Sequence, residues 1–216
     1  MQIIIESQFL PPIAAFAYFA RASKLQIESQ ENYQKRSFRN RAVILGSSGP
    51  MNISIPLKKG KNNQQNIKMV EIAYDQNWTG TLLNQIKSAY GKSPYFEFYF
   101  DEIEAILDQK PALLFELNMN LMHFLFKQLH WGKSIIHTDE YLDVYDTTII
   151  DLRNKIRPQH GAFLKYVKYR YYPQVFEHKF GFTSNLSILD LLFNLGPEAS
   201  MILEETELEL IINSSE

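Results

Sequence analysis

The stretch ENYQKRSFRNRAVILGSSGPMNISIPL, residues 31–57, contains the clearest fold signal of the chain. An apolar run at 42–45 is followed by the turn Gly46-Ser47-Ser48-Gly49-Pro50 and by the alternating residues 51–55. Two β-type runs around a turn rich in glycine and proline predict a β-hairpin. Residues 31–41 hold one acid, Glu31, and four bases: Lys35, Arg36, Arg39 and Arg41. An anion site is therefore expected beside this basic hairpin.

The composition of the 216 residues is typical of a folded domain, with 45% hydrophobic and 13% aromatic residues. The absence of cysteine excludes disulfides, thiol nucleophiles and thiolate metal sites. A net charge of −2 and a pI near 6.2 argue against a general nucleic-acid-binding protein. We find neither a basic leader nor a long uncharged apolar run, so the sequence predicts no signal peptide, no membrane span and a cytoplasmic location.

Charge is unevenly distributed along the chain. Residues 33–61 contain seven bases and no acid, whereas residues 198–216 contain six acids and no base. The acidic tail and the basic hairpin either pair with each other or form two solvated faces, and the second interpretation is the simpler one.

The patterns around the hairpin predict a single α/β domain covering residues 1–216. We expect a mixed β-sheet that includes the basic β-hairpin, flanking helices, and a helical or irregular C-terminal segment (141–216) packed on an α/β core (1–140). Periodicity and turn signals predict strands at 2–6, 25–28, 67–74 and 133–137, and helices at 13–22, 78–90, 102–109, 112–129 and 141–157. Ser187 and Asp190 form a predicted capping box for one more helix.

Asn118 is an unusual residue in the helix predicted at 112–129. The polar residues of this helix form one narrow stripe, made of Glu116, Asn120, His123 and Lys127. Asn118 lies off that stripe among leucines and methionines, where a buried amide needs hydrogen-bond partners. It therefore either fixes a neighbouring backbone segment or faces a ligand, and we favour the first role.

The arginines of the hairpin have two possible partners. If Val43 and Leu45 point inward, the alternation of a strand places Arg39 and Arg41 on that same side, at the edge of the core. Arginines at such a position pair with a planar acceptor, such as a carboxylate or a phosphate. That acceptor is either a ligand or an internal acid, for which Glu97, Glu102 and the acidic tail are the candidates.

Other patterns of chemical interest are weak. His123, His130 and His137 recur every seven residues, but no HxxH, HxH or HExxH spacing occurs, so we predict no metal site and no cofactor. No P-loop, GxGxxG or GxSxG motif occurs either. Residues 163–172 interleave bases with aromatics, as in a single-strand nucleic-acid surface, but an amphipathic surface segment is the commoner explanation. The candidates for a catalytic base are Glu31, His123, His137 and Asp139.

Five groups of residues carry a family resemblance. They are Phe9-Leu10-Pro11-Pro12 with Tyr18-Phe19, Tyr33–Ser37 with Asn40-Arg41, Trp78 with Tyr90 and Ser93–Phe96, Glu116-Leu117-Asn118, and Tyr172–Phe176 with Asn185–Leu192. On these residues the chain resembles the WbqC-like family, which is often associated with bacterial polysaccharide (O-antigen) gene clusters. One departure is Glu6-Ser7, where many relatives have Gln-Pro, so a ligand role of that glutamine does not transfer.

The resemblance implies an enzyme of surface-sugar modification, such as an acyl or aminoacyl transferase. Our first hypothesis is a transferase that binds a small anionic substrate, either a nucleotide sugar or an activated acyl donor. The alternative is a non-catalytic binding or scaffold protein of envelope biogenesis. The residues predicted to bind the substrate, with both tyrosines as a stacking wall, are Lys35, Arg36, Arg39, Asn40, Arg41, Tyr90, Tyr95, Asn118 and Gln174.

Overall fold

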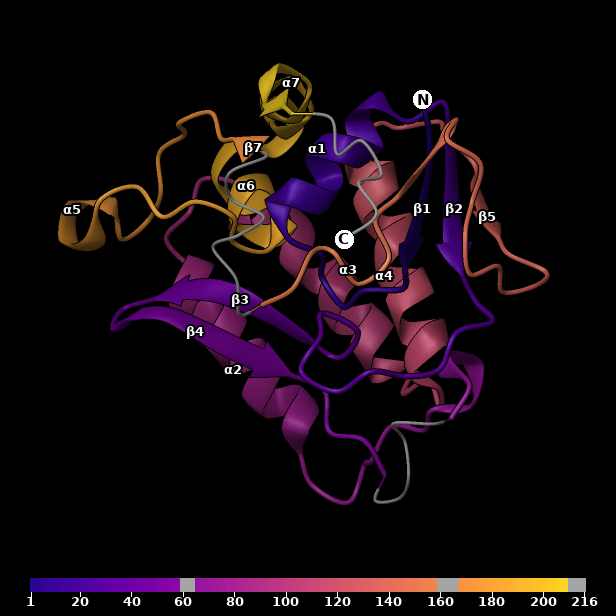
Figure 1. Cartoon of the computed structure of the whole chain (residues 1–216). Helices are drawn as coiled ribbons and strands as arrows, with labels where there is room; N and C mark the ends of the chain where they lie inside the picture. The colour runs from indigo at the N-terminus through magenta and orange to yellow at the C-terminus, as the bar shows by residue number, and fades with distance from the viewer. Residues whose placement is uncertain (59–64, 159–166, 210–216) are drawn as a thin grey trace.

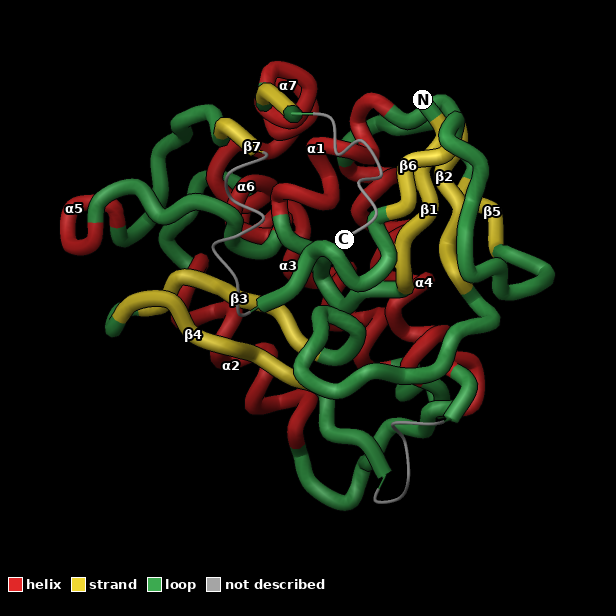
Figure 2. Tube along the Cα trace, in the orientation of Figure 1, coloured by secondary structure: helices red, strands yellow, loops and turns green. Residues whose placement is uncertain are grey.

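A four-stranded parallel sheet assembles strands that lie far apart in the sequence. The computed structural model describes residues 1–58, 65–158 and 167–209. The sheet has the strand order β5-β2-β1-β6 and contains β1 (Gln2–Glu6), β2 (Lys24–Glu28), β5 (Ile135–His137) and β6 (Ile149–Asp151). All neighbouring pairs are parallel, and Figure 2 shows the four strands side by side.

The central strand β1 is buried on both faces. Ile3, Ile4 and Ile5 have no exposed surface, which is typical of a parallel strand covered by other elements on each side. After β1 the chain turns at two prolines into helix α1 (Ile13–Arg21) and returns as β2, in the manner of a β–α–β unit. The strand at 2–6 and the helix after it are confirmed.

The basic hairpin is confirmed, but it forms a two-stranded sheet of its own and does not join the parallel sheet into the mixed sheet that we expected. β3 (Arg41–Gly46) pairs antiparallel with β4 (Gly49–Ser54), from Arg41 opposite Ser54 to Gly46 opposite Gly49. The turn needs a glycine, because Gly49 adopts a φ of +110°. Figure 1 shows the hairpin lying apart from the parallel sheet and alongside helix α2 (Trp78–Tyr90).

Of the three long helices, α4 (Leu114–Gln128) is the most deeply buried. α3 (Phe96–Asp108) and α4 follow α2, and most of α4 is buried as its sequence predicts. The predicted strand at 67–74 is wrong. Asn66 instead caps the short 3-10 helix η2 (Ile67–Met69) by accepting a hydrogen bond from the Lys68 N–H, and only isolated bridges follow.

The C-terminal segment contains a core helix and short elements around it. These are β7 (Val167–Lys168), α5 (Glu177–Phe180), α6 (Ile188–Leu195), η4 (Gly196–Glu198), α7 (Ala199–Glu205) and β8 (Glu207–Leu208). Arg21, at the end of α1, fastens this segment by donating to the carbonyls of Leu203, Glu204 and Thr206. The predicted helix at 141–157 is wrong, because the β-branched run Thr147–Ile150 leads into β6.

The α/β class with flanking helices and a helical C-terminal segment is confirmed. Within the described parts of the chain, no helix has both the length and the apolar character that crossing a membrane requires.

Candidate functional site

Two buried glutamates end the two inner strands of the parallel sheet. Glu6 is the last residue of β1 and Glu28 the last of β2, they are partners in the strand register, and each is at most 1% exposed. The chain leaves β1 toward β2 on one side, and β6 joins β1 on the other. In open α/β sheets, ligands bind beyond the carboxyl ends of the strands at such a change of direction. A ligand site is therefore expected at this carboxyl edge.

Glu28 is held by three donors from different segments. Its carboxylate accepts hydrogen bonds from Thr138 Oγ1 (2.6 Å), the Gln30 N–H (2.9 Å) and Arg153 Nη1 (3.0 Å). Arg153 also pairs with Asp151 (2.8 Å). Burial alone would lower the pKa of the Arg153 guanidinium, but the hydrogen bonds and the charge of Asp151 outweigh it and raise the pKa. Arg153 therefore stays charged.

Two aromatic rings of the loop after β5 pack on Arg153. The guanidinium carbon lies 4.6 Å from the Tyr141 ring centroid and 4.7 Å from that of Tyr145. These are cation–π distances. Arg153 thus links residues 138–148 to the carboxyl edge.

Glu6 is held by the chain that follows β6 and by its own neighbour. Its carboxylate accepts hydrogen bonds from the Asn154 N–H (2.8 Å) and from Gln8 Nε2 (2.8 Å). Asn154 adopts a φ of +60°, which asparagine tolerates better than most residues. Its side-chain oxygen accepts from Arg39 Nη2 (2.9 Å), so Arg39 is drawn to the same edge.

Glu31 and Arg39 form a buried ion pair at this edge. Arg39 Nε donates to Glu31 Oε1 (2.8 Å), Nη2 donates to Oε2, and the two residues are 0% and 4% exposed. Burial raises the pKa of the Glu31 carboxyl to about 7; Arg39 opposes this, while the charges of Glu6 and Glu28 add to it. A carboxyl with a pKa near the working pH is suited to accept and return a proton.

A pocket of about 650 Å³ opens beside Glu31. Its lining residues are Gln30, Glu31, Asn32, Gln34, Lys35 and Tyr141. This volume lies within the range of small-molecule sites. Three buried polar atoms of the same edge have no hydrogen-bond partner in the structure: Ser7 Oγ, Gln8 Oε1 and Arg39 Nη1. Unsatisfied buried groups are rare in folded proteins, and a bound ligand is one explanation for them.

The structure distributes the predicted basic residues over different environments. Lys35 lines the pocket, and the exposed Arg36 follows it with a φ of +58°. Arg39 pairs with Glu31, whereas the expected internal acids were Glu97, Glu102 and the acidic tail. Glu31 is 8 positions from Arg39 in the sequence. The internal pair is therefore local.

Arg39 and Arg41 do not share one side of a strand, because β3 begins only at Arg41. Ala42 and Ile44 face the core, so the partly exposed Val43 and Arg41 point the other way. The Nε of Arg41 is buried without a partner. The neighbouring Asn40 is buried and bonds the Tyr33 hydroxyl (3.0 Å) and the Ile55 carbonyl (2.9 Å).

Asn118 performs the structural role that we favoured. Its Nδ2 donates to the Arg39 carbonyl (2.8 Å) and so holds the backbone of the arginine in place, while its Oδ1 has no partner. The core helix α4 thereby supports the candidate site from below. Asn118 lies outside the lining of the pocket.

Tyr90 and Gln174 belong to a second buried network, centred on Asp190. Asp190 Oδ2 accepts hydrogen bonds from the Tyr172 hydroxyl (2.6 Å) and from Gln174 Nε2 (2.8 Å), and Tyr90 acts on this carboxylate by lowering its pKa. The Tyr90 oxygen accepts from the Leu45 N–H (3.4 Å). The network joins the hairpin, α2, α6 and the loop before α5, so its contacts give both predicted residues a structural role.

Burial dominates the electrostatics of this network. It raises the pKa of Asp190 to about 6, against the lowering effect of its hydrogen bonds.

The predicted capping box is confirmed for Ser187 and wrong for Asp190. Ser187 caps α6 by accepting from the Leu189 N–H (3.3 Å), but the Asp190 carboxylate bonds Tyr172 and Gln174, and the Ser187 N–H donates to Val43.

We expect Tyr172→Phe to lower the free energy of unfolding by about 1–2 kcal/mol, because it removes a hydrogen bond to a buried carboxylate. Tyr171→Phe is the matched control, since the neighbouring hydroxyl bonds Glu177 at the surface (3.0 Å). Urea denaturation of both variants measures the difference. Equal stabilities of the two variants would contradict the role given to the network.

Tyr95 packs against the C-terminal segment. A Cβ atom on residue 196 would lie 2.4 Å from the Tyr95 ring, so glycine is required at that position. The Tyr95 ring also stacks on the ring of Tyr99. Tyr90 instead packs on Phe193, with ring centroids 5.2 Å apart. The aromatic residue of the pocket wall is Tyr141, which the sequence analysis did not select.

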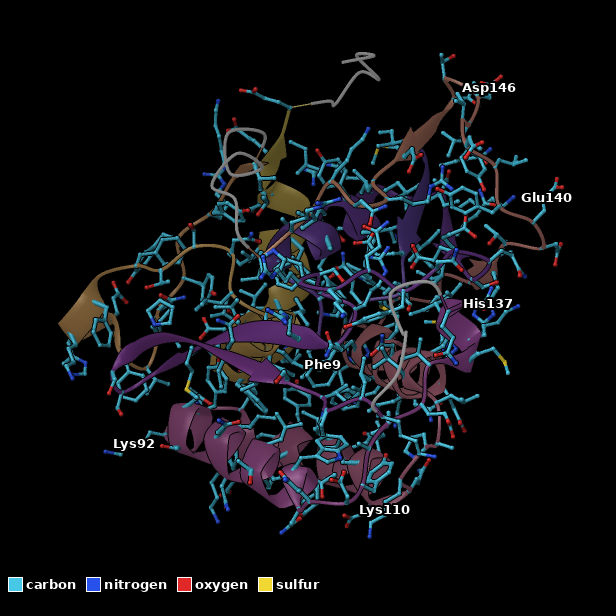
Figure 3. All side chains as sticks on the ribbon, turned by 60° about the horizontal axis from the view of Figure 1, so that its bottom comes forward. Phe9, Lys92, Lys110, His137, Glu140 and Asp146 are labelled. Atoms are coloured by element: carbon cyan, nitrogen blue, oxygen red, sulfur yellow. The ribbon has the colours of Figure 1, made fainter. Side chains whose placement is uncertain are left out.

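The remaining candidate bases lie on the surface. His123 and Asp139 are exposed, and His137 ends β5 with its ring against Phe115. Figure 3 shows His137 and Glu140 at the periphery, whereas Phe9 lies in the interior. In the parts of the chain with described coordinates, no group of three or more histidine, aspartate or glutamate side chains could hold a metal ion.

In the described part of the segment 163–172, two basic side chains lie beside acids of the C-terminal tail. Residues 163–166 lie outside the described residues. Lys168 pairs with Glu207 (3.1 Å), and Arg170 lies 4.0 Å from Glu205. Two acids of the tail, Glu205 and Glu207, thus face these bases.

Sequence reasoning missed Glu6, Glu28, Arg153 and Asn154 as members of the site. A signal did exist for the glutamates, because the short apolar runs QIIIE and KLQIE each end on a glutamate. Arg153 and Asn154 carry no comparable pattern.

One comparison with known proteins identifies a family. The model of the WbqC-like protein family matches residues 6–160 and 152–202. The uncharacterized protein Rv1507c of Mycobacterium tuberculosis is 26% identical over 226 residues, which cover 91% of this chain and 94% of that protein. No solved structure matches the chain significantly.

Proposed function

The chain belongs to the WbqC-like protein family, and from this premise we propose that it is a transferase of bacterial surface-polysaccharide biosynthesis. Its substrate would be a small anionic donor, either a nucleotide sugar or an activated acyl or aminoacyl compound, bound in the pocket at the carboxyl edge of the sheet. Such donors are made in the cytoplasm, where we propose that the protein works.

The observation that carries this proposal is the position of Glu31. Its carboxyl lines the pocket, its pKa is raised to about 7, and Arg39 fixes its orientation. A strongly perturbed pKa in a cleft marks a candidate functional residue. We assign Glu31 as the general base.

The chemistry follows from the charges around the pocket. The acceptor is a hydroxyl or amine whose O–H or N–H proton passes to Glu31 as its oxygen or nitrogen attacks the donor. The bond between the donor's reactive carbon and its leaving group breaks, and the electron pair leaves on the anionic leaving group. Lys35, which lines the same pocket, supplies the positive charge opposite that anion.

A thermal-shift screen of nucleotide sugars and acyl donors tests the proposal. A ligand at about 100 times its Kd stabilises the native state by roughly 2.7 kcal/mol. We expect Lys35→Ala to weaken the shift and Glu31→Gln to abolish turnover while keeping binding. Lys87→Ala, an exposed change on α2 away from the pocket, is the control. A shift of equal size in the Lys35→Ala and Lys87→Ala proteins would contradict the proposed pocket.

A scaffold or binding protein is the second candidate, and two observations favour it. Arg39 is paired internally, and the loop after β5 exposes three large hydrophobic side chains: Tyr141, Leu142 and Val144, the last of them 83% exposed. Exposed apolar clusters mark interaction surfaces. Under this hypothesis Val144→Asp abolishes partner capture. An unchanged interaction profile of Val144→Asp, together with a ligand shift in the wild type, would favour the transferase.

A further inference from the structure

A second, separate groove lies between the hairpin and helix α2, which run beside each other in Figure 1. Its volume is about 430 Å³. β4 contributes alternate residues, which point to one face of a strand, and α2 contributes residues spaced by three and four, which share one face of a helix. The full lining is Asn52, Ser54, Gln76, Asn77, Trp78, Thr81, Leu82 and Gln85.

The lining of this groove is polar but carries no charged side chain. Its amides each offer two donors and one acceptor oxygen, and its hydroxyls donate and accept. The pocket at the sheet edge differs, because Glu31 and Lys35 line it. A groove of neutral donors and acceptors suits a ligand that presents many hydroxyl groups and no charge.

Trp78 brings an aromatic ring to the wall of this groove. The side chain is 8% exposed and its ring packs on that of Tyr74, with centroids 5.6 Å apart. Its Nε1 is buried without a hydrogen-bond partner in the structure. This N–H is covered by the protein itself, so a ligand in the groove lies against the indole ring and not against its donor.

We infer that the groove between β4 and α2 is a second binding site, which takes a neutral hydroxylated ligand of sugar size. The Trp78 ring lies against the ligand, and the amides of Asn52 and Gln85, on opposite walls, bond its hydroxyls. This site is independent of the proposed transfer reaction, because the two pockets share no lining residue.

The two tryptophans of the chain provide a direct test in the wild-type protein. Each gives one indole N–H signal in a ¹H–¹⁵N spectrum, and Trp131→Phe assigns them. Glucose and N-acetylglucosamine are the probes, titrated to about 50 mM, far above a Kd on the order of 1 mM. We expect a saturable shift of the Trp78 signal. The Trp131 signal should stay in place, because its Nε1 already bonds Ser200 (2.7 Å).

Two neighbouring residues of α2 complete the test. Gln85→Ala removes a lining amide and should raise the Kd about 5- to 10-fold, the usual effect of one lost hydrogen bond. Asn84→Ala, exposed and outside the lining, should leave it unchanged. The inference is overturned if neither sugar shifts the Trp78 signal, if both variants bind alike, or if inorganic phosphate competes with the sugar.

Discussion

Arg39→Ala is expected to lower the free energy of unfolding by about 3–5 kcal/mol, the usual cost of removing one partner of a buried ion pair. The change leaves the Glu31 carboxylate buried without its partner and the Asn154 side-chain oxygen without a donor. For a chain of this length, the melting temperature should fall by roughly 6–20 °C. Thermal and urea denaturation of the wild type and the variant measure the loss.

Arg41→Ala is the matched control for this prediction. Arg41 lies two positions away and is only partly buried, and its change should cost at most about 1 kcal/mol. The double variant Glu31→Gln/Arg39→Ala should be less destabilised than the sum of its single changes, because the two side chains are in contact. Strict additivity would show that the pair is not coupled in solution.

The stability of the wild-type protein should fall by about 3 kcal/mol as the pH rises from about 4.5 to 7.5 because of Glu31 alone. Burial raises the pKa of this carboxyl from its ordinary value of 4.5 to about 7 in the folded state. Between these values the folded chain binds more protons than the unfolded chain, so raising the pH favours unfolding. Above the folded pKa the contribution becomes constant.

Glu31→Gln isolates this contribution. Asp190, whose pKa is raised to about 6, acts in the same direction at lower pH. Urea denaturation across this pH range gives the difference in unfolding free energy between the wild type and Glu31→Gln. The contributions of Asp190 and all other titrating groups cancel in this difference. We expect this difference to change steeply up to about pH 7 and then level off. A difference that does not vary with pH would place the folded pKa of Glu31 near its ordinary value.

The sequence predicts the fold well where a pattern is local. The hairpin, the strand at 2–6 and the polar stripe of α4 each follow from residues close in the chain, and all three are confirmed. The segment 67–74 has the composition of a strand, but the Asn66 side chain accepts a hydrogen bond from the Lys68 N–H and caps a 3-10 helix instead. No local pattern shows which apolar run will find a partner strand.

The candidate site is less predictable because its members come from separate strand ends. The cluster of bases before the hairpin predicted Lys35 as a binding residue, and Glu31 was one of four candidates for a catalytic base. Only the strand order brings Glu6, Glu28 and Arg153 to the same edge. The raised pKa of Glu31 depends on that assembly, since burial and two neighbouring carboxylates cause it. The two tyrosines predicted as a wall lie elsewhere, because an aromatic run serves the core as readily as a pocket.

The pairing of β6 with β1 has a consequence for synthesis on the ribosome. Asn154 is 148 positions from its partner Glu6, so the edge of β1 stays open until most of the chain has been made. An apolar edge strand such as Ile3-Ile4-Ile5 is a template for aggregation while it is unpaired. Closing so long a loop is slow, and the nascent chain therefore depends on its C-terminal third both to protect this edge and to finish the site.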